Sequence, residues 1–271
     1  MDWIYGKTVL ITGASSGIGK TLTLQLIREH NCNVLGIGQS EEKMRSLMKE
    51  LSYMSDRFAY KLFDISNADY WEQLADDLLE ENIVVDVLIN NAGTMPPFDK
   101  STNYSEEKIL KTMDVNFHGC RYAINSMLPV LRNSSMPAII NVSSSSALAP
   151  LVGTSIYSAS KAALKAYTES LIGELGREIY IAYVCPGFTK TDIFRNQYFI
   201  SDGRLINFMS TNLDKMVRKI IKKIIKQKSR IIVGKDAKFM NFTSKFFPVL
   251  GLKFYEIILK KSKLKMFENI N

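Results

Sequence analysis

The amino-acid sequence predicts an α/β fold in which a doubly wound parallel sheet of about seven strands carries helices on both faces. Two observations support this fold class. Apolar runs of strand length alternate with longer segments of helical period, and a glycine-rich turn follows the first apolar run. The 271 residues contain no internal repeat and no linker rich in Pro, Gly or Ser. We therefore expect a single domain spanning residues 1–271.

The expected strands are short apolar runs, and the expected helices are the segments between them in which apolar residues recur every three or four positions. In chain order the strands are Thr8–Thr12, Asn33–Ile37, Phe58–Phe63, Val85–Asn90, Ala138–Val142, Ile179–Val184 and Arg230–Val233. In chain order the helices are Gly17–Glu29, Glu41–Leu51, Tyr70–Glu80, Glu106–Leu131, Ser155–Gly176 and Leu213–Lys226. Strand and helix alternate throughout, as parallel sheets require.

Composition excludes several classes of protein. Hydrophobic residues at 46% and charged residues at 23% are typical of a globular chain and argue against disorder. Three separated cysteines without CxxC spacing and only two histidines argue against a disulfide framework, a zinc site and a histidine-based triad, so we expect no metal. The first residues enter a strand without a signal-peptide pattern, which predicts a cytoplasmic protein.

The positive charge is confined to one part of the chain. From Asp214 onward there are 16 Lys and Arg against 4 Asp and Glu, a balance of +12. Because the whole chain carries +8, the first 213 residues sum to −4. The basic character therefore belongs to the C-terminal region and needs an explanation specific to that region.

The segment Thr12-Gly13-Ala14-Ser15-Ser16-Gly17-Ile18-Gly19 follows the first strand and opens a helix. Its glycines would let the backbone approach a pyrophosphate, and the N–H groups at the helix N-terminus would favour the phosphate charge. A tight strand-to-helix turn without a ligand is the alternative interpretation of this segment alone.

Five further motifs follow in order, and with the glycine turn they cover about residues 7–192. They are Asn90-Asn91-Ala92-Gly93, Asn116, Ser144, Tyr157-Ser158-Ala159-Ser160-Lys161, and Pro186-Gly187-Phe188-Thr189-Lys190-Thr191. In this combination the chain resembles the short-chain dehydrogenase/reductase family, with its TGxxxGxG, NNAG and YxxxK patterns. The resemblance implies a Rossmann-type dinucleotide-binding oxidoreductase.

The YxxxK pair has a physical rationale of its own. Tyr157 and Lys161 are four residues apart on an expected helix, so they share one face. A phenol is a weak base at neutral pH, but a nearby ammonium lowers its pKa and favours the phenolate. Tyr157 would exchange a proton with the substrate oxygen during hydride transfer, and Ser144 would hydrogen-bond that oxygen. The resemblance implies that Lys161 also binds ribose hydroxyls and that Asn116 holds a water linking Lys161 to solvent.

Each of these residues also has a structural interpretation. The Tyr157–Lys161 pair could lie on a solvated helix face, the Ser143–Ser146 run could be a polar loop, and Asn116 could be a buried, hydrogen-bonded amide. Agreement among all the motifs favours the catalytic interpretation. Ser144 is selected within the serine run because the serine of the family usually precedes the tyrosine by thirteen residues, as Ser144 does here.

The resemblance implies a cofactor site at the ends of successive strands. Asp64 would bind the adenine amino group, Asn91 and Gly93 would lie against the adenosine side, and Thr191 would bind the nicotinamide carboxamide. Asp64 could otherwise be a turn residue and Thr191 a helix cap. The complete expected set is Gly13, Ser15, Ser16, Gly17, Ile18, Gly19, Gln39, Ser40, Asp64, Ile65, Asn91, Ala92, Gly93, Tyr157, Lys161, Pro186, Gly187, Thr189 and Thr191.

The residues after the second strand bear on the choice of nucleotide. An NAD site usually carries an acidic residue there, and an NADP site carries a cation for the 2′-phosphate. Here Gly38 stands in the acidic position and Gln39 where an arginine often falls, so neither marker is present. Without the acid, phosphate is not repelled, and Gln39, Ser40 and Lys43 would donate to it. We therefore expect NADP(H) in preference to NAD(H), with NAD(H) as the alternative.

Three segments match no family motif. Residues 193–213 form the expected variable substrate loop, whose apolar residues would line a pocket together with Pro150, Leu151 and Val152 or would only pack the loop onto the body. Helix Leu213–Lys226 pairs an apolar stripe with lysines and is expected to pack on the core. Residues 239–271 form a basic, apolar extension, too interrupted by lysines to span a membrane, that would touch an anionic membrane surface or cap the pocket.

The predicted function is reversible hydride transfer between NAD(P)(H) and a secondary alcohol or ketone, with a bulky or lipophilic substrate favoured by the apolar loop. A nicotinamide-nucleotide sensor or scaffold without turnover is the alternative, and a membrane-surface or partner-binding protein acting through its tail is a third. The partners expected are a small-molecule substrate and, by resemblance alone, further copies of the chain in a homodimer or homotetramer. Nucleic acid is not expected, since no nucleic-acid motif accompanies the charge.

Overall fold

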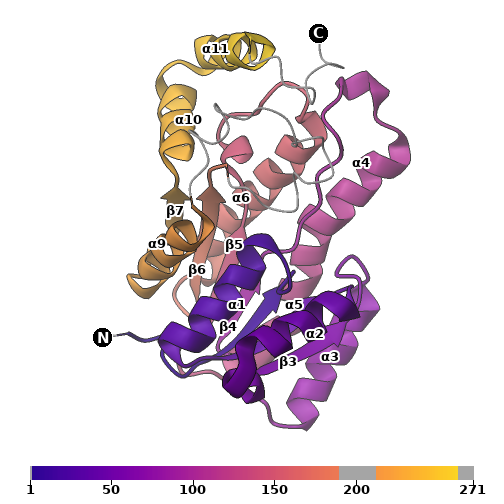
Figure 1. Cartoon of the computed structure of the whole chain (residues 1–271), viewed down its shortest axis with the longest axis vertical. Coiled ribbons are helices and arrows are strands. Elements are labelled where there is room, and N and C mark those ends of the chain that lie inside the picture. Colours follow the sequence, from indigo (N-terminus) through magenta and orange to yellow (C-terminus); the bar gives the residue numbers. More distant parts are fainter. Residues whose placement is uncertain (1, 189–211, 262–271) are drawn as a thin grey trace.

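The computed structural model describes residues 2–188 and 212–261, and its strands form a seven-stranded parallel sheet in the order β3-β2-β1-β4-β5-β6-β7 (Figure 1). The strands are β1 (Thr8–Thr12), β2 (Asn33–Gly38), β3 (Phe58–Leu62), β4 (Val87–Asn90), β5 (Ala138–Val142), β6 (Tyr180–Pro186) and β7 (Arg230–Val233). The helices are α1 (Gly17–His30), α2 (Glu41–Leu51), α3 (Ala68–Glu80), α4 (Glu106–Met113), α5 (Gly119–Arg132), α6 (Ser155–Leu175), α9 (Leu213–Ile225), α10 (Lys235–Phe246) and α11 (Pro248–Lys261). Short helical turns are η1 (Ser52–Arg57), η2 (Ser101–Asn103), η3 (Asp114–His118) and η4 (Ser145–Ala147).

The predicted fold class is confirmed. Strands β1, β5 and β7 have the predicted bounds, β2, β3 and β4 differ by one or two residues at one end, and β6 differs at both ends. The strand order reverses between β1 and β4, because the chain returns from the edge strand β3 to the centre of the sheet. In sheets of this kind the carboxyl ends of the strands at the reversal form a crevice for ligands.

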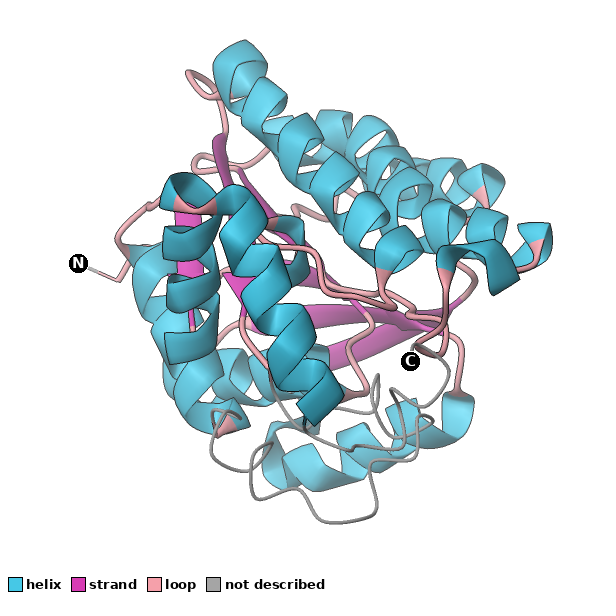
Figure 2. Cartoon of the chain, turned by 90° about the horizontal axis from the view of Figure 1, so that it is seen from above, coloured by secondary structure: helices cyan, strands magenta, loops and turns pink. Residues whose placement is uncertain are grey.

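Side chains of the central strands alternate between two apolar layers. On β1, Val9 and Ile11 enter one layer and Leu10 enters the other. Helices α1, α2 and α9 pack on the first layer, and α3, α5 and α6 pack on the second. Figure 2 shows the helices on both sides of the sheet. This burial of both faces explains why the strands are continuous apolar runs.

The single helix predicted over Glu106–Leu131 is wrong in one respect. A π-helical turn, η3, separates α4 from α5. At this turn the side chain of Asn116 is completely buried and hydrogen-bonds both the N–H and the carbonyl of Thr94 at 2.8 Å. We attribute the wider turn to this contact with the loop that contains Thr94. The hydrophobic periodicity of the helix does not depend on that contact and so could not predict the turn.

Helix α9 packs on the core as expected from its apolar stripe. Met216, Val217 and Ile220 are buried in the layer that also holds α1. On the outer side, Arg218 pairs with Glu29 of α1 at 2.6 Å. Lys215, Lys219 and Lys222 are exposed on the outer face of this packed helix, whereas Lys223 is half-buried and donates to the carbonyl of Ile232 at 3.0 Å.

The segment from residue 239 onward, for which no helix was predicted, belongs to α10 and α11 as far as Lys261. Gly234, with a φ of 120°, separates β7 from α10. Among residues 2–188 and 212–261, no helix combines the length and the apolar character needed to cross a membrane. The predicted substrate loop, 193–213, lies almost entirely outside the described residues.

Candidate functional site

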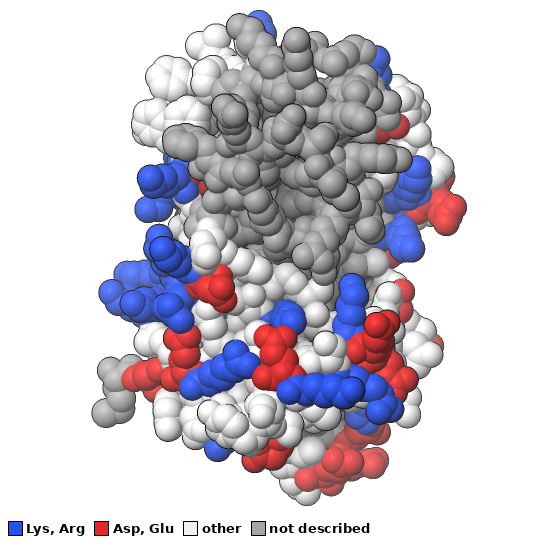
Figure 3. Space-filling model, viewed as in Figure 1, with Lys and Arg blue, Asp and Glu red and all other residues white. Residues whose placement is uncertain are grey.

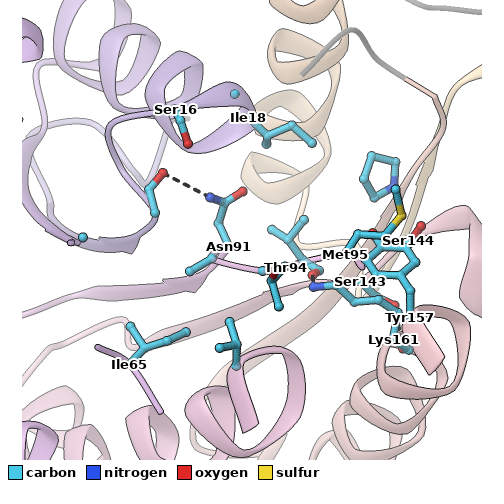
Figure 4. Close-up of a pocket in the computed structure, with 18 of the residues that line it drawn as sticks. Ser16, Ile18, Ile65, Asn91, Thr94, Met95, Ser143, Ser144, Tyr157 and Lys161 are labelled. Atoms are coloured by element: carbon cyan, nitrogen blue, oxygen red, sulfur yellow. Dashed lines mark hydrogen bonds between the residues drawn. The ribbon is translucent and has the colours of Figure 1, made fainter. Parts of the chain in front are cut away.

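A cavity of about 580 Å³ opens at the carboxyl ends of the strands. It extends from the glycine turn after β1 to the serine run after β5 and the start of α6 (Figure 4). In Figure 4, Ser16, Ile18 and Asn91 lie at one end, Ser144, Tyr157 and Lys161 at the other, and Thr94 and Met95 between them. Most of the predicted site residues therefore line one continuous space.

The turn after β1 has the backbone conformation that its glycines allow. Gly13 and Gly17 have φ values of 66° and 49°. Gly19 is packed below the cavity, where a Cβ would lie only 2.1 Å from the carbonyl oxygen of Gly13. Ser16 is the N-cap of α1, yet its side chain makes no capping hydrogen bond. Ser16, Gly17 and Ile18 border the cavity, so the first turn of α1 presents backbone N–H groups to a ligand there.

Asn91 holds the glycine turn in place. Its side-chain nitrogen donates to the carbonyl of Thr12 at 2.9 Å, and its backbone N–H donates to the Thr12 hydroxyl at 2.9 Å. The N–H of Ala92 also donates to that hydroxyl. Asn91, Ala92 and Gly93 line the cavity as predicted, and Asn91 in addition supports the turn.

The adenosine end of the expected site contains the predicted residues Gln39, Ser40, Asp64 and Ile65. Burial alone would raise the pKa of Asp64, but hydrogen bonds from Ser66 and Gln39 and the charge of Lys111 hold that pKa below its usual value. Asp64 is thus an ionised acceptor at neutral pH. The hydroxyl of Ser40 accepts from the backbone N–H of Lys43 at 3.3 Å and caps α2.

Several lining residues at this end were missed. Lys111 reaches the cavity from α4, and Phe63 reaches it from the end of β3. Neither belongs to a motif, so no sequence signal marked them. Lys43, which was named as a phosphate donor but not placed in the predicted set, also lines the cavity from α2.

The opposite end brings together the predicted catalytic residues Ser144, Tyr157 and Lys161. All three are buried, with exposed fractions of 8%, 8% and 3%. Ser144 is hydrogen-bonded to Tyr157, and its oxygen also accepts from the N–H of Ser146 at 3.1 Å. The ammonium of Lys161 donates to the carbonyl of Val142 at 3.0 Å. The solvated-face interpretation of the Tyr157–Lys161 pair is therefore wrong.

The four serines of the Ser143–Ser146 run make different contacts. The Ser143 hydroxyl donates to the backbone carbonyl of Lys161 at 2.8 Å and ties β5 to α6. Ser144 is the member that contacts Tyr157. Ser145 and Ser146 begin the turn η4 and border the cavity. The geometry thus agrees with the choice of Ser144 rather than Ser143 as the partner of the tyrosine.

One electrostatic expectation fails in this structure. Lys161 was expected to lower the pKa of Tyr157, but burial raises that pKa, and the group that opposes the rise is Ser144. Burial also lowers the pKa of Lys161 itself. Burial is the largest influence on the pKa of Tyr157, and Lys161, whose ammonium donates to the Val142 carbonyl, is not among the groups that shift it. Tyr157 is therefore a protonated phenol at neutral pH.

Asn116 lies beside this end without lining the cavity. Its amide nitrogen donates to Thr94 and, at 2.9 Å, to the Ser160 hydroxyl on α6. A Cβ on Gly93 would lie 3.0 Å from the Asn116 amide oxygen and 3.1 Å from the Lys161 nitrogen, so both approach the same backbone. The amide is buried and hydrogen-bonded, and the predicted water relay through Asn116 stays a prediction.

The segment after β6 reaches the cavity through Pro186, Gly187 and Phe188. Its anchor was not predicted: the Asp236 carboxylate on α10 accepts from the N–H of Phe188 at 2.5 Å. A Cβ on Gly187 would lie 2.1 Å from this carboxylate, so a larger residue there would require the Asp236 side chain to move. The predicted cofactor residues Thr189 and Thr191 lie outside the described residues.

The cavity wall beyond the catalytic residues is apolar. Met95, Phe98, Leu151 and Phe188 line it, and Leu151 is one of the three residues predicted to border a substrate pocket. Pro150 and Val152 are not among its lining residues in the described part of the chain. Met95 and Phe98 follow the NNAG motif but belong to no pattern of their own, and so they were missed.

The residues at the glycine-rich end fit the sugar-phosphate part of a nicotinamide dinucleotide. The α1 N-terminus and the Ser15 and Ser16 hydroxyls supply donors for phosphate, and Asp64 supplies an acceptor. The absence of a side chain on Gly93 leaves room beside the Lys161 ammonium. The donor set is therefore appropriate for such a group at this end and for a reactive oxygen at the Tyr157 end.

A family model described as short chain dehydrogenase matches residues 7–198. The chain is 34% identical over 207 residues to 11-beta-hydroxysteroid dehydrogenase 1A of Arabidopsis thaliana. The aligned region covers 75% of this chain and 58% of that protein. It is 31% identical over 195 residues to benzil reductase ((S)-benzoin forming) IRC24 of Saccharomyces cerevisiae, which covers 69% of this chain and 73% of that protein. The chain thus spans 58% of the length of the plant relative.

The fold is also shared with solved structures. A short chain dehydrogenase from Burkholderia cenocepacia J2315 in complex with NADP has a TM-score of 0.77, covering 93% of this chain and 98% of that one at 24% identity. This likeness extends the agreement in fold beyond residue 198, where the family match ends.

Proposed function

The chain belongs to the short-chain dehydrogenase/reductase family, and we propose that it interconverts a bulky, lipophilic ketone and the corresponding secondary alcohol with NADP(H). The observation that carries the proposal is the presence of Ser144, Tyr157 and Lys161 in the same cavity as the glycine turn of α1. A protein that only bound a nucleotide would have no need for a buried hydroxyl pair at the far end of that cavity.

The roles of the three residues follow from their surroundings. When bound, the nicotinamide nucleotide supplies or accepts the hydride. Tyr157 donates its proton to the ketone oxygen in reduction and takes the alcohol proton in oxidation. Because burial raises the pKa of Tyr157, the phenol holds its proton at neutral pH, which suits the reductive direction.

Ser144 and Lys161 act on either side of the tyrosine. The single proton of the Ser144 hydroxyl, which is hydrogen-bonded to Tyr157, can be donated to the substrate oxygen instead and so hold that oxygen beside the phenol. Lys161 uses one of its three N–H donors on the Val142 carbonyl. Its remaining N–H donors would bind ribose hydroxyls, as in the family.

The preference for NADP(H) is supported by what stands at the end of β2. Gly38 brings no carboxylate to the cavity, and Lys43 lines it within reach of the Gln39–Ser40 turn. A lysine ammonium binds the charged 2′-phosphate of NADP(H) more strongly than the neutral 2′-hydroxyl of NAD(H).

The substrate class is supported by the cavity wall. Met95, Phe98, Leu151 and Phe188 offer apolar surface beside Tyr157, which favours a large apolar carbonyl compound over a small polar one. The printed names of two relatives, a hydroxysteroid dehydrogenase and a benzil reductase, point to substrates of the same kind.

The test combines nucleotide binding with turnover. NADPH and NADH are titrated into the purified chain, and NADPH oxidation is then followed with benzil, a ketosteroid and a small aliphatic ketone. Tyr157→Phe should keep its NADPH affinity and lose turnover by about 10²- to 10⁴-fold, since the proton donor is removed. Tyr167→Phe, on the same helix but outside the cavity, is the matched control and should change neither quantity.

Three outcomes separate the possibilities. Turnover of the large ketones that depends on Tyr157 supports the proposal. Tight NADPH binding without turnover of any ketone would support the sensor or scaffold function. The absence of binding of either nucleotide would overturn the assignment of the site.

A further inference from the structure

The helices α10 and α11 carry a concentration of exposed apolar side chains. In the described part of the chain, 18 large hydrophobic residues are exposed, and nine of them lie between residues 239 and 257. The other nine are scattered over residues 5–136, which is normal for a protein surface. We call the nine the aromatic patch: Phe239, Phe242, Phe246, Phe247, Val249, Leu250, Leu252, Phe254 and Ile257. A patch of this density marks an interaction surface.

The patch is the outer face of an anchored helix pair. On the inner face, Met240 and Tyr255 are buried against Ala149 and Leu151. The Thr243 hydroxyl of α10 is hydrogen-bonded to the Tyr255 hydroxyl of α11. The helix pair is therefore folded and packed on the rest of the domain, and the phenylalanines on its outer face are exposed even so.

The aromatic side chains stay exposed in a defined arrangement. The Phe242 ring lies 5.0 Å from that of Phe246, and the Phe239 ring lies 6.1 Å from that of Phe254 across the two helices. The rings thus form two groups of packed rings rather than separate protrusions. Leu250 is the most exposed member of the patch at 67%, followed by Phe246 and Val249 at 63% each.

Lysines are interleaved with the patch. Lys235, Lys238, Lys245 and Lys253 are exposed on the same two helices. Lys238, Phe242 and Lys245 follow one another at helical spacing and share a face. The Asp236 carboxylate of α10 is turned inward onto Phe188. Figure 3 shows uncharged side chains at the upper left, where α10 and α11 lie, with Lys and Arg below them on the same edge.

We propose that the aromatic patch and its lysines dock α10 and α11 onto an anionic lipid bilayer. Phenylalanine and leucine would enter the boundary between headgroups and acyl chains, and the lysines would bind the anionic headgroups. At 12 and 14 residues the helices have the length of elements lying along a surface rather than crossing it. A second copy of the chain is a poorer occupant, because a twofold interface would bring like-charged lysines together.

Docking would place the bilayer next to the cavity. Leu151, against which the inner face of the helix pair packs, also lines the apolar wall near Tyr157. The lipid surface would then lie on one side of the helix pair and the cavity on the other. This inference concerns a surface and stands whether or not the chain turns over a ketone.

The test is co-sedimentation of the full chain with two kinds of vesicle, phosphatidylcholine alone and phosphatidylcholine with phosphatidylserine. We expect binding to the phosphatidylserine vesicles that weakens as salt is raised. The double variant Phe246→Ser with Leu250→Ser should bind about a hundredfold more weakly, at roughly tenfold for each apolar side chain removed. Tyr53→Ser, at a residue 90% exposed beyond α2, is the matched control and should bind like the natural chain.

A second pair of variants tests the charge. Lys245→Gln with Lys253→Gln should lower binding to phosphatidylserine vesicles by about thirtyfold, whereas Lys49→Gln with Lys108→Gln should not. Circular dichroism and NADPH affinity should be unchanged in every variant, since none of these residues lines the cavity. Equal binding by natural chain and patch variants would overturn the proposal. Absence of vesicle binding would also overturn it, and patch-dependent self-association in sedimentation velocity would then assign the surface to a second copy.

Discussion

The two ends of the cavity are held together by different contacts. At the glycine turn, backbone packs on backbone, whereas beside α10 the carboxylate of one side chain packs on backbone. A Cβ on Gly19 would lie 2.1 Å from the carbonyl oxygen of Gly13, in the same turn. A Cβ on Gly187 would lie equally close to a carboxylate oxygen of Asp236, which follows the next strand of the sheet. The first contact is built by neighbours in sequence and the second by residues far apart.

Because of this difference, the two ends of the cavity should tolerate substitutions to different degrees. Two backbone segments cannot move apart without changing strand β1, which is almost entirely buried, or helix α1, which packs one face on the core. A carboxylate can rotate or be replaced by a similar side chain. We therefore expect changes at the glycine turn to have large effects on nucleotide binding and changes around α10 to have graded ones.

The largest effect is expected from Gly19→Ala. The added methyl group would overlap the Gly13 carbonyl and displace the turn that presents N–H groups to the nucleotide. NADPH affinity, measured by fluorescence titration, should fall by about a hundredfold or more, in the range expected when several hydrogen bonds to charged groups are lost.

Gly173→Ala is the matched control for that change. Gly173 lies in α6, and a Cβ there would meet nothing within 4 Å. Alanine in an exposed helix is more favourable than glycine by about 0.5–1 kcal/mol, so this variant should melt slightly higher and bind NADPH normally. Equal NADPH affinities in the two variants would contradict the prediction, because they would show that the turn accommodates the added methyl group without losing its contacts to the nucleotide.

The same contrast explains what could be predicted from the sequence. The glycine turn, the serine after β5 and the Tyr157–Lys161 pair were found because their chemistry is local and each motif spans few residues. Asp236 was missed because its partner, Phe188, is 48 residues away and no motif joins them. The π-helical turn at Asn116 was missed for a similar reason, since its cause is a contact with Thr94.

Periodicity failed for the last two helices on physical grounds. An amphipathic pattern identifies a helix when one face is apolar and the other polar, as in α9. In α10 the buried face uses Ala237, Met240 and Thr243, while phenylalanines lie on the exposed face. Apolar residues on both faces hide the period, so the segment suggested a broken apolar tail rather than a pair of helices.

The next largest effect is expected from Leu151→Ala, at the α10 end. Leu151 is buried against Met240 and Tyr255 and also lines the cavity. Removing its side chain should lower the free energy of unfolding by about 2 kcal/mol, at the lower end for a buried leucine. In urea titrations this appears as a lower midpoint. The KM for a large ketone should rise while NADPH affinity stays the same, and a fall in NADPH affinity would contradict the separation of the two ends.

A smaller and more selective effect is expected from Lys43→Ala at the adenosine end. If Lys43 binds the 2′-phosphate, its loss should weaken NADPH binding by about tenfold, the size of one charge-assisted hydrogen bond, and leave NADH binding unchanged. Lys49→Ala, exposed on the same helix α2, is the control and should affect neither nucleotide. Equal weakening of both nucleotides by Lys43→Ala would argue against a phosphate contact.

The smallest effect is expected from Asp236→Asn, and it depends on pH. Burial raises the pKa of Asp236 above its usual value of 3.8, so ionisation is less favourable in the folded chain than in the unfolded one. As pH rises from 3.8 through the raised pKa, the natural chain should therefore lose stability relative to the asparagine variant. Above that window the difference should be constant. Urea midpoints of both chains between about pH 4 and pH 7 measure it, and parallel profiles would contradict it.

The matched variant Asp236→Ala distinguishes charge from position. Asparagine keeps an oxygen that can accept from the Phe188 N–H, and alanine does not. The alanine variant should therefore loosen the Pro186–Phe188 segment and weaken NADPH binding, while the asparagine variant binds normally. If both variants bind normally, the α10 carboxylate does not position this wall of the cavity, and the tolerance inferred for the α10 end is greater still.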